Sequence, residues 1–178
     1  MRGEEKKATR RIAVSALLAA LGVVLLLLGS FVQVLDLSMA VIASLTVVFA
    51  VIEMGGKYPM LIYAVTSVLA LLLLPVKTAA LIYFAFAGYY PVLKAVLEGR
   101  LTKPLAWILK FVIFCAAVAA ALFIAGKLLL MDLSWIFANW WFLICLLPVF
   151  VLYDFALTRL ISAYLGKWRA RLRLPDLR

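Results

Sequence analysis

The sequence predicts an all-α, multi-pass membrane protein with six transmembrane helices. Hydrophobic residues make up 69% of its 178 residues and charged residues only 15%, whereas soluble domains are about half apolar and a quarter charged. The charges stand mainly at the ends of long apolar runs. Because these runs are continuous, they indicate helices and not the alternating strands of about ten residues that build a transmembrane β-barrel.

The first helix is expected over residues 12–35, directly after a basic leader at residues 1–11. This run contains no charge, and roughly 20 apolar residues at 1.5 Å per residue cross a bilayer core of about 30 Å. It is longer than the apolar region of a typical signal peptide, and no clear A-x-A cleavage site follows. The run is therefore predicted to be a retained helix.

The second and third helices are expected over residues 37–53 and 58–74. Asp36 precedes the second helix, where its side chain can accept hydrogen bonds from free backbone N–H groups and cap the helix. Residues 54–57 are predicted to form a tight turn with glycine at the helix C-terminus. Pro59 lies in the first turn of the third helix, where a missing N–H costs least.

The last three helices are expected over residues 78–97, 105–130 and 134–165. Pro91 lies inside the fourth helix and is expected to kink it, because proline removes a backbone hydrogen bond. The transmembrane domain thus covers residues 12–166, and a basic cytoplasmic tail covers residues 167–178. The tail residues predicted to lie at the membrane surface are Arg169, Arg171 and Arg173.

The distribution of lysine and arginine predicts that both termini are cytoplasmic. With six spans and the N-terminus inside, sixteen of these residues map to the inner side and two to the outer side. Positively charged residues are retained on the cytoplasmic side of a membrane. The net charge of +10 is therefore interpreted as orientation in the cell membrane and not as nucleic-acid binding.

Five ionisable residues fall near the inner ends of the predicted spans. We interpret them as interfacial charges that pair with one another or extend toward water. Lys94 and Glu98 are four residues apart on one helix, where opposite charges can pair. The five residues are Glu53, Lys94, Glu98, Lys110 and Asp154.

The chain shows no motif for catalysis. It has no histidine, and serine or cysteine without histidine or a placed aspartate lacks the usual activation. Cys115 and Cys145 fall inside apolar runs and are expected to be buried packing residues. There is no phosphate-binding loop, so any ATP-driven step needs another subunit. No enzyme activity, cofactor or metal site is predicted.

A small-molecule site is predicted at the outer mouth of the helix bundle. Polar side chains and aromatic rings gather there, as such a site requires. The same residues are equally explained as a helix cap, loop charges and a tryptophan belt, and both interpretations stay open. The candidate residues are Gln33, Asp36, Lys77, Asp132, Asn139 and Trp140.

The first helix carries small residues in two stripes, which allow another helix to approach closely in lipid. One stripe contains Ala13, Ala16 and Ala20, and the other contains Ser15, Ala19 and Gly22. We expect this part of the helix to pack against a partner subunit.

The segment TRRIAVSALLAAL, with Ala16 and Ala20 in AxxxA spacing, resembles the start of S components of energy-coupling factor transporters. The chain length, the six helices and the cytoplasmic termini are also similar to this family, so the resemblance covers nearly the whole chain. The turn MGGKYP differs from the Gly-Pro-x-x-Gly-like turn of many members. The chain thus resembles an S-component-like bacterial membrane protein with the corresponding helix bundle.

The resemblance implies a substrate-binding subunit for uptake of a vitamin-like micronutrient. A membrane-embedded coupling subunit would contact the alanine face of the first helix, and cytoplasmic ATPases would supply the energy. The alternative is a non-catalytic structural or assembly protein that contacts another membrane protein or anionic lipid through Arg169, Arg171 and Arg173.

Overall fold

The computed structural model describes residues 2–128, 134, 139 and 141–168 of the chain. Within these residues the protein is helical and contains no strand, which confirms the predicted all-α class. The chain divides into two compact units. The first includes Met1–Ile113 and the second is Phe114–Pro175.

The first unit contains most of the helices. They are α1 (Arg2–Phe31), the short 3₁₀ turn η1 (Gln33–Leu35), α2 (Asp36–Glu53), α3 (Tyr58–Leu73), α4 (Thr78–Ile82), the π-helical turn η2 (Tyr83–Ala87) and α5 (Tyr90–Arg100). The division between the units falls within α6 (Lys103–Phe123). The second unit continues with η3 (Ile124–Leu128), α8 (Trp141–Ala163) and η4 (Tyr164–Trp168).

Among the residues that the structure describes, five helical segments are long and apolar enough to cross a membrane, so the chain is compatible with membrane insertion. They are Lys7–Phe31, Asp36–Glu53, Thr78–Arg100, Lys103–Lys127 and Ile144–Gly166. The predicted third span corresponds to α3, an apolar helix of 16 residues. At 1.5 Å per residue α3 is about 24 Å long, shorter than a bilayer core of about 30 Å.

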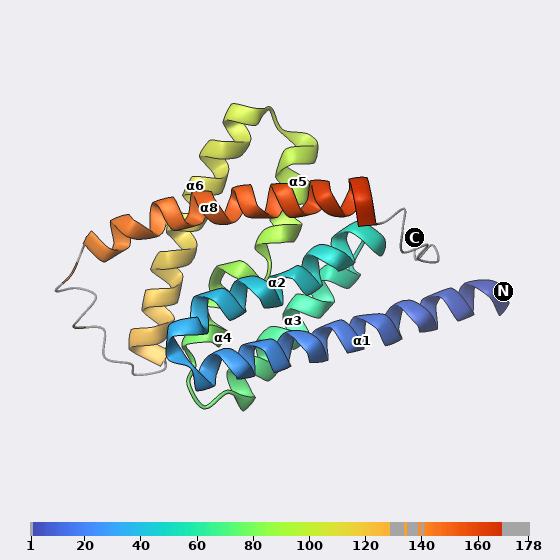
Figure 1. Cartoon of the computed structure of the whole chain (residues 1–178), viewed down its shortest axis with the longest axis horizontal. Helices are drawn as coiled ribbons and strands as arrows, with labels where there is room; N and C mark the ends of the chain where they lie inside the picture. Colours follow the sequence, from blue (N-terminus) through green and yellow to red (C-terminus); the bar gives the residue numbers. More distant parts are fainter. Residues whose placement is uncertain (1, 129–133, 135–138, 140, 169–178) are drawn as a thin grey trace. The chain divides into compact units, whose positions relative to one another are not determined.

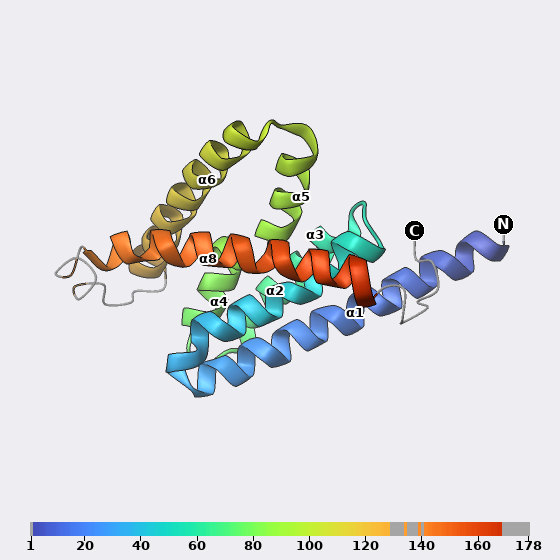
Figure 2. The ribbon, with the colours of Figure 1, turned by 45° about the horizontal axis from the view of Figure 1, so that its top comes forward.

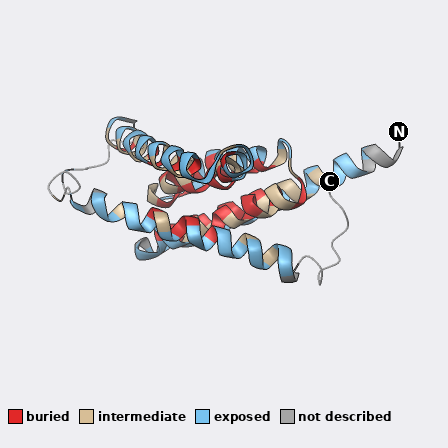
Figure 3. Cartoon of the chain, turned by 90° about the horizontal axis from the view of Figure 1, so that it is seen from above, coloured by how far each residue is buried: buried red, intermediate tan, exposed pale blue. Residues whose placement is uncertain are grey.

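The core of the first unit lies where α1 packs against α2 and α3 (Figures 1 and 2). Alanine supplies much of this core, including Ala19, Ala43 and Ala70, and Leu26 and Val47 are fully buried among the same helices. Small side chains bring helix backbones close together, and in lipid such packing holds helices together. In Figure 3, the part of α1 near the N label is exposed, and buried residues appear farther along the helix.

The turn between α2 and α3 has the predicted conformation. Gly55 and Gly56 both have a φ of 59°, in the left-handed region that glycine adopts without steric cost. The middle of α1 lies beside this turn, because the Ser15 hydroxyl is 3.7 Å from the Met54 sulfur. The α2–α3 turn therefore packs against the middle of α1.

The predicted fourth helix is interrupted and not simply kinked. The α4 helix continues into the π-helical turn η2, a break follows at Gly88 and Tyr89, and α5 starts at Tyr90. Pro91 lies in the first turn of α5, so the expectation of a proline inside a helix is wrong. Proline fits a first turn because the N–H it lacks has no partner there.

Two other expectations about single residues are also wrong. Asp36 is the first residue of α2 and makes no capping hydrogen bond, and Leu35 occupies the cap position. Cys115 and Cys145 are exposed free thiols and not buried packing residues. Apolar runs in a membrane protein do not separate core from surface, because lipid accepts apolar side chains as readily as the protein interior does.

Candidate functional site

Three of the predicted outer-mouth residues lie in the first unit. Gln33 lies in η1, Asp36 begins α2, and Lys77 precedes α4, all within the first unit. The Lys77 ammonium donates to the Leu74 carbonyl at 2.5 Å. Asn139 lies in a turn of the second unit. Asp132 and Trp140 lie outside the described residues.

Asp36 has the most unusual environment of this set. It is only 6% exposed, and its Oδ1 atom has no hydrogen-bond partner in the described part of the chain. A buried polar atom without a partner is costly, and a native structure usually satisfies it with a protein group, water or a ligand. The carboxylate can therefore accept a hydrogen bond from a group outside the described protein.

The structure separates the two small-residue stripes of α1. Ala13, Ala16 and Ala20 are exposed, whereas Ala19 is 3% exposed and lies in the core. The half-buried Ser15 bonds to the Arg11 carbonyl within its own helix. We name the exposed set Ala13, Ala16 and Ala20 the alanine face.

The other stripe packs against α3 through Ala19 and Gly22. The Thr66 hydroxyl donates to the Ala19 carbonyl at 3.4 Å, and a Cβ added to Gly22 would lie 3.0 Å from Thr66 Cγ2. The buried stripe thus holds α1 on its own bundle. The alanine face, flanked by the exposed side chains of Leu17 and Leu21, remains accessible to a second helix or to lipid.

Two of the five ionisable residues, Lys94 and Lys110, are buried in a cluster. From the sequence we had interpreted them as interfacial charges. Lys94 is 2% exposed and Lys110 is 1% exposed. Both ammoniums donate to Glu98 Oε1, at 2.8 Å from Lys94 and 2.5 Å from Lys110. The predicted pair between Lys94 and Glu98 is confirmed. Lys110 also lies 5.1 Å from the centre of the Trp107 ring, where a cation is attracted by the aromatic face.

The cluster joins α5 to α6, because Lys94 and Glu98 lie on α5 and Lys110 lies on α6. Glu53 and Asp154 are buried as well, at 2% and 3% exposure. Buried charges are retained only with partners, and inside membranes they often serve a function. The Lys94–Glu98–Lys110 cluster therefore fixes the relative positions of α5 and α6.

A group of hydroxyls in the core of the first unit was not predicted. Thr46, Thr66, Ser67 and Tyr83 come from three different segments, α2, α3 and η2, and each is at most 4% exposed. The Tyr83 hydroxyl lies near the hydroxyls of Thr66 and Thr46 but forms no hydrogen bond of good geometry with them. In the sequence these hydroxyls are visible only as single polar residues inside apolar runs. The order of residues does not show that they face one another.

The remaining predicted site residues cannot be placed. Arg169, Arg171 and Arg173 lie outside the described residues. In the described part of the chain, no three histidine, cysteine, aspartate or glutamate side chains gather in a way that could hold a metal ion.

Comparison with protein-family models, with curated proteins and with solved structures finds no match for this chain.

Proposed function

We propose that the protein is an integral membrane subunit that binds a small, vitamin-like micronutrient and works with a separate ATP-driven coupling module. The observation that carries this proposal is the alanine face of α1. It is exposed, while the neighbouring stripe with Ala19 and Gly22 packs inside the protein. The α1 helix thus has one small-residue surface that packs inside the protein and a second one, the alanine face, that is exposed.

Such a surface suits a helix of a coupling subunit. Helices in lipid associate through close van der Waals packing, because hydrophobicity gives no driving force there. Alanine side chains let two backbones approach, and the leucines beside them would cover the sides of the contact. The coupling subunit and its cytoplasmic ATPases would supply the chemistry for which the chain carries no motif.

The partnerless oxygen of Asp36 supports the ligand part of the proposal. A polar ligand group that donates a hydrogen bond to Oδ1 would remove the cost of leaving this buried atom unsatisfied. Gln33 and Lys77 lie in the same unit as Asp36 and belong to the proposed ligand set.

The alanine face can be tested by substitution. Ala16→Leu and Ala20→Leu would hold a partner helix away, whereas Ala64→Leu, on the exposed surface of α3, adds the same volume elsewhere. Tagged protein is purified in mild detergent, and co-purifying proteins are identified by mass spectrometry. We expect the wild type and Ala64→Leu to retain a membrane-embedded partner with ATPases, and the α1 variants to lose it while remaining folded.

Small molecules are extracted from the same samples. A bound vitamin-like compound that is lost in Asp36→Asn supports the ligand site. Recovery of the coupling subunits by both α1 variants would contradict the role of the alanine face. Folded wild-type protein with neither partner nor compound would favour the structural or assembly role.

A further inference from the structure

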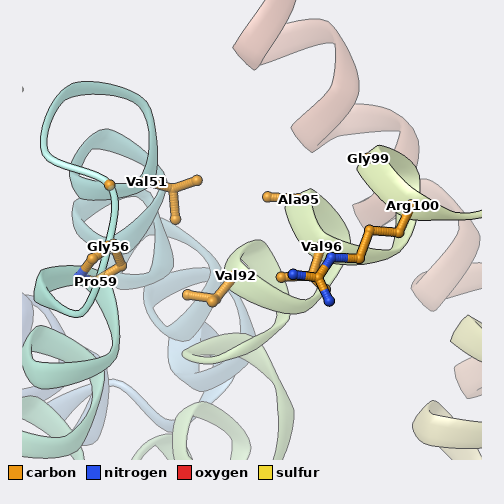
Figure 4. Close-up of a pocket in the computed structure, with 9 residues that line it drawn as sticks. Val51, Gly56, Pro59, Val92, Ala95, Val96, Gly99 and Arg100 are labelled. Atoms are coloured by element: carbon orange, nitrogen blue, oxygen red, sulfur yellow. The ribbon is translucent and has the colours of Figure 1, made fainter.

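A hollow of about 370 Å³ lies within the first unit, between the α2–α3 turn and α5 (Figure 4). Val51 and Pro59 line one side, and Val92, Ala95 and Val96 of α5 line the other. The volume is in the range of small-molecule sites, and the lining is predominantly apolar. The hollow can therefore accept a hydrocarbon group of moderate size.

Arg100, the last residue of α5, is the only charged residue that lines the hollow. Its side chain makes no ion pair within the described part of the chain. The nearest acid along the helix is Glu98, whose Oε1 already accepts from Lys94 and Lys110. The guanidinium is thus available to an anion from outside the protein.

The surroundings of the hollow increase its positive charge. Lys57 in the α2–α3 turn is exposed. The Arg11 guanidinium lies 5.8 Å from the centre of the Tyr58 ring, beside the same turn. An anion at Arg100 would lie in a positive potential, and the cytoplasmic leaflet, which attracts such basic residues, is rich in anionic lipids.

We propose that this hollow binds an anionic phospholipid, with its phosphate at Arg100 and the beginning of an acyl chain against the valines. Free phosphate would leave the apolar lining uncovered, and a neutral phospholipid would bring no net charge to the guanidinium. The backbone leaves room for a headgroup, because a Cβ added at Gly55, Gly56 or Gly99 would meet no atom within 4 Å. This assignment does not depend on the proposed transport function.

The test is native mass spectrometry of the full chain in detergent with added lipid. Phosphatidylglycerol is compared with phosphatidylcholine of the same acyl chains. The variants are Arg100→Gln, which removes the charge, and Ala95→Phe, which fills the hollow. Lys103→Gln is the control, because it removes a nearby exposed charge that does not line the hollow.

We expect wild-type protein and Lys103→Gln to prefer phosphatidylglycerol. Arg100→Gln should weaken this binding by about fivefold, the effect of one basic residue near an anionic surface. Ala95→Phe should weaken binding of both lipids, and excess glycerophosphate should not displace phosphatidylglycerol from the wild type.

Equal binding of phosphatidylglycerol by the wild type, Arg100→Gln and Ala95→Phe would overturn the proposal, because the lipid would then be surface lipid without a site. Displacement by glycerophosphate would also overturn it and would indicate a site for a soluble phosphate. Arg100 is exposed, so Arg100→Gln is expected to fold and decides the question even if Ala95→Phe does not.

Discussion

At the scale of single residues, the Glu98 carboxylate links α5 to α6. Lys94 and Lys110 are almost completely buried, and both donate to the same Glu98 oxygen. Neighbouring ammoniums repel each other, and the carboxylate offsets this repulsion. Glu98 itself is 46% exposed, so water screens part of the interaction.

Glu98→Gln is therefore expected to lower the stability of the protein by about 1–2 kcal/mol, because two buried ammoniums lose a charged acceptor. Thermal unfolding in detergent, followed by circular dichroism, measures this change. Glu5→Gln alters an exposed glutamate near the start of α1 and should leave the midpoint unchanged. An unchanged midpoint for Glu98→Gln would show that the cluster does not stabilise the α5–α6 connection.

At the scale of elements, the break between α4 and α5 depends on Gly88. Aromatic rings pack around the break, with Tyr63 5.8 Å from Tyr89 and 6.2 Å from Tyr83 between ring centres. A Cβ at Gly88 would lie 2.6 Å from the Tyr63 ring and 2.7 Å from the Tyr83 ring. The break therefore needs a residue without a side chain at position 88.

Gly88→Ala should destabilise the protein by about 1–3 kcal/mol, the usual cost of overpacking, because the two tyrosine rings must move. Gly99→Ala is the matched control, since Gly99 lies in α5 with no atom within 4 Å of the added Cβ. Alanine should stabilise that position by up to about 1 kcal/mol through its helix propensity. Unfolding midpoints of the two variants should therefore shift in opposite directions, and an equal shift would refute the steric role of Gly88.

At the scale of the whole molecule, the number of crossings depends on α3. In the described part of the chain, five helical segments have the length and apolarity of a span, and α3 is shorter. If α3 crosses the bilayer, six spans put both termini on one side. If it does not, five spans put them on opposite sides. Whether the two termini lie on the same side thus depends on whether α3 crosses the bilayer. The cytoplasmic location of both termini stays a prediction.

Cysteine labelling in cells, in a background without Cys115 and Cys145, tests this arrangement. Val34→Cys lies in η1 and is 90% exposed in the wild type, Lys57→Cys lies in the α2–α3 turn, and Pro75→Cys follows α3. An impermeant maleimide should label positions 34 and 75 in intact cells and position 57 only after permeabilisation. Labelling of positions 57 and 75 from the same side would show that α3 does not cross.

The sequence by itself determined the helical class, the positions of most helices and the turn at Gly55 and Gly56. Continuous apolar runs, their length and glycine between two helices are local properties, and local properties are visible in the order of residues. The pairing of Lys94 with Glu98 was equally visible, because residues four apart share one face of a helix.

Only the tertiary structure decided which small-residue stripe of α1 is internal, that Lys110 joins the Lys94–Glu98 pair, and that hydroxyls of three segments meet around Tyr83. In lipid, both the interior and the surface of a protein are apolar, so hydropathy does not indicate which face of a helix is covered. That information comes from contacts between segments distant in the sequence, such as Thr66 with Ala19 and Lys110 with Glu98.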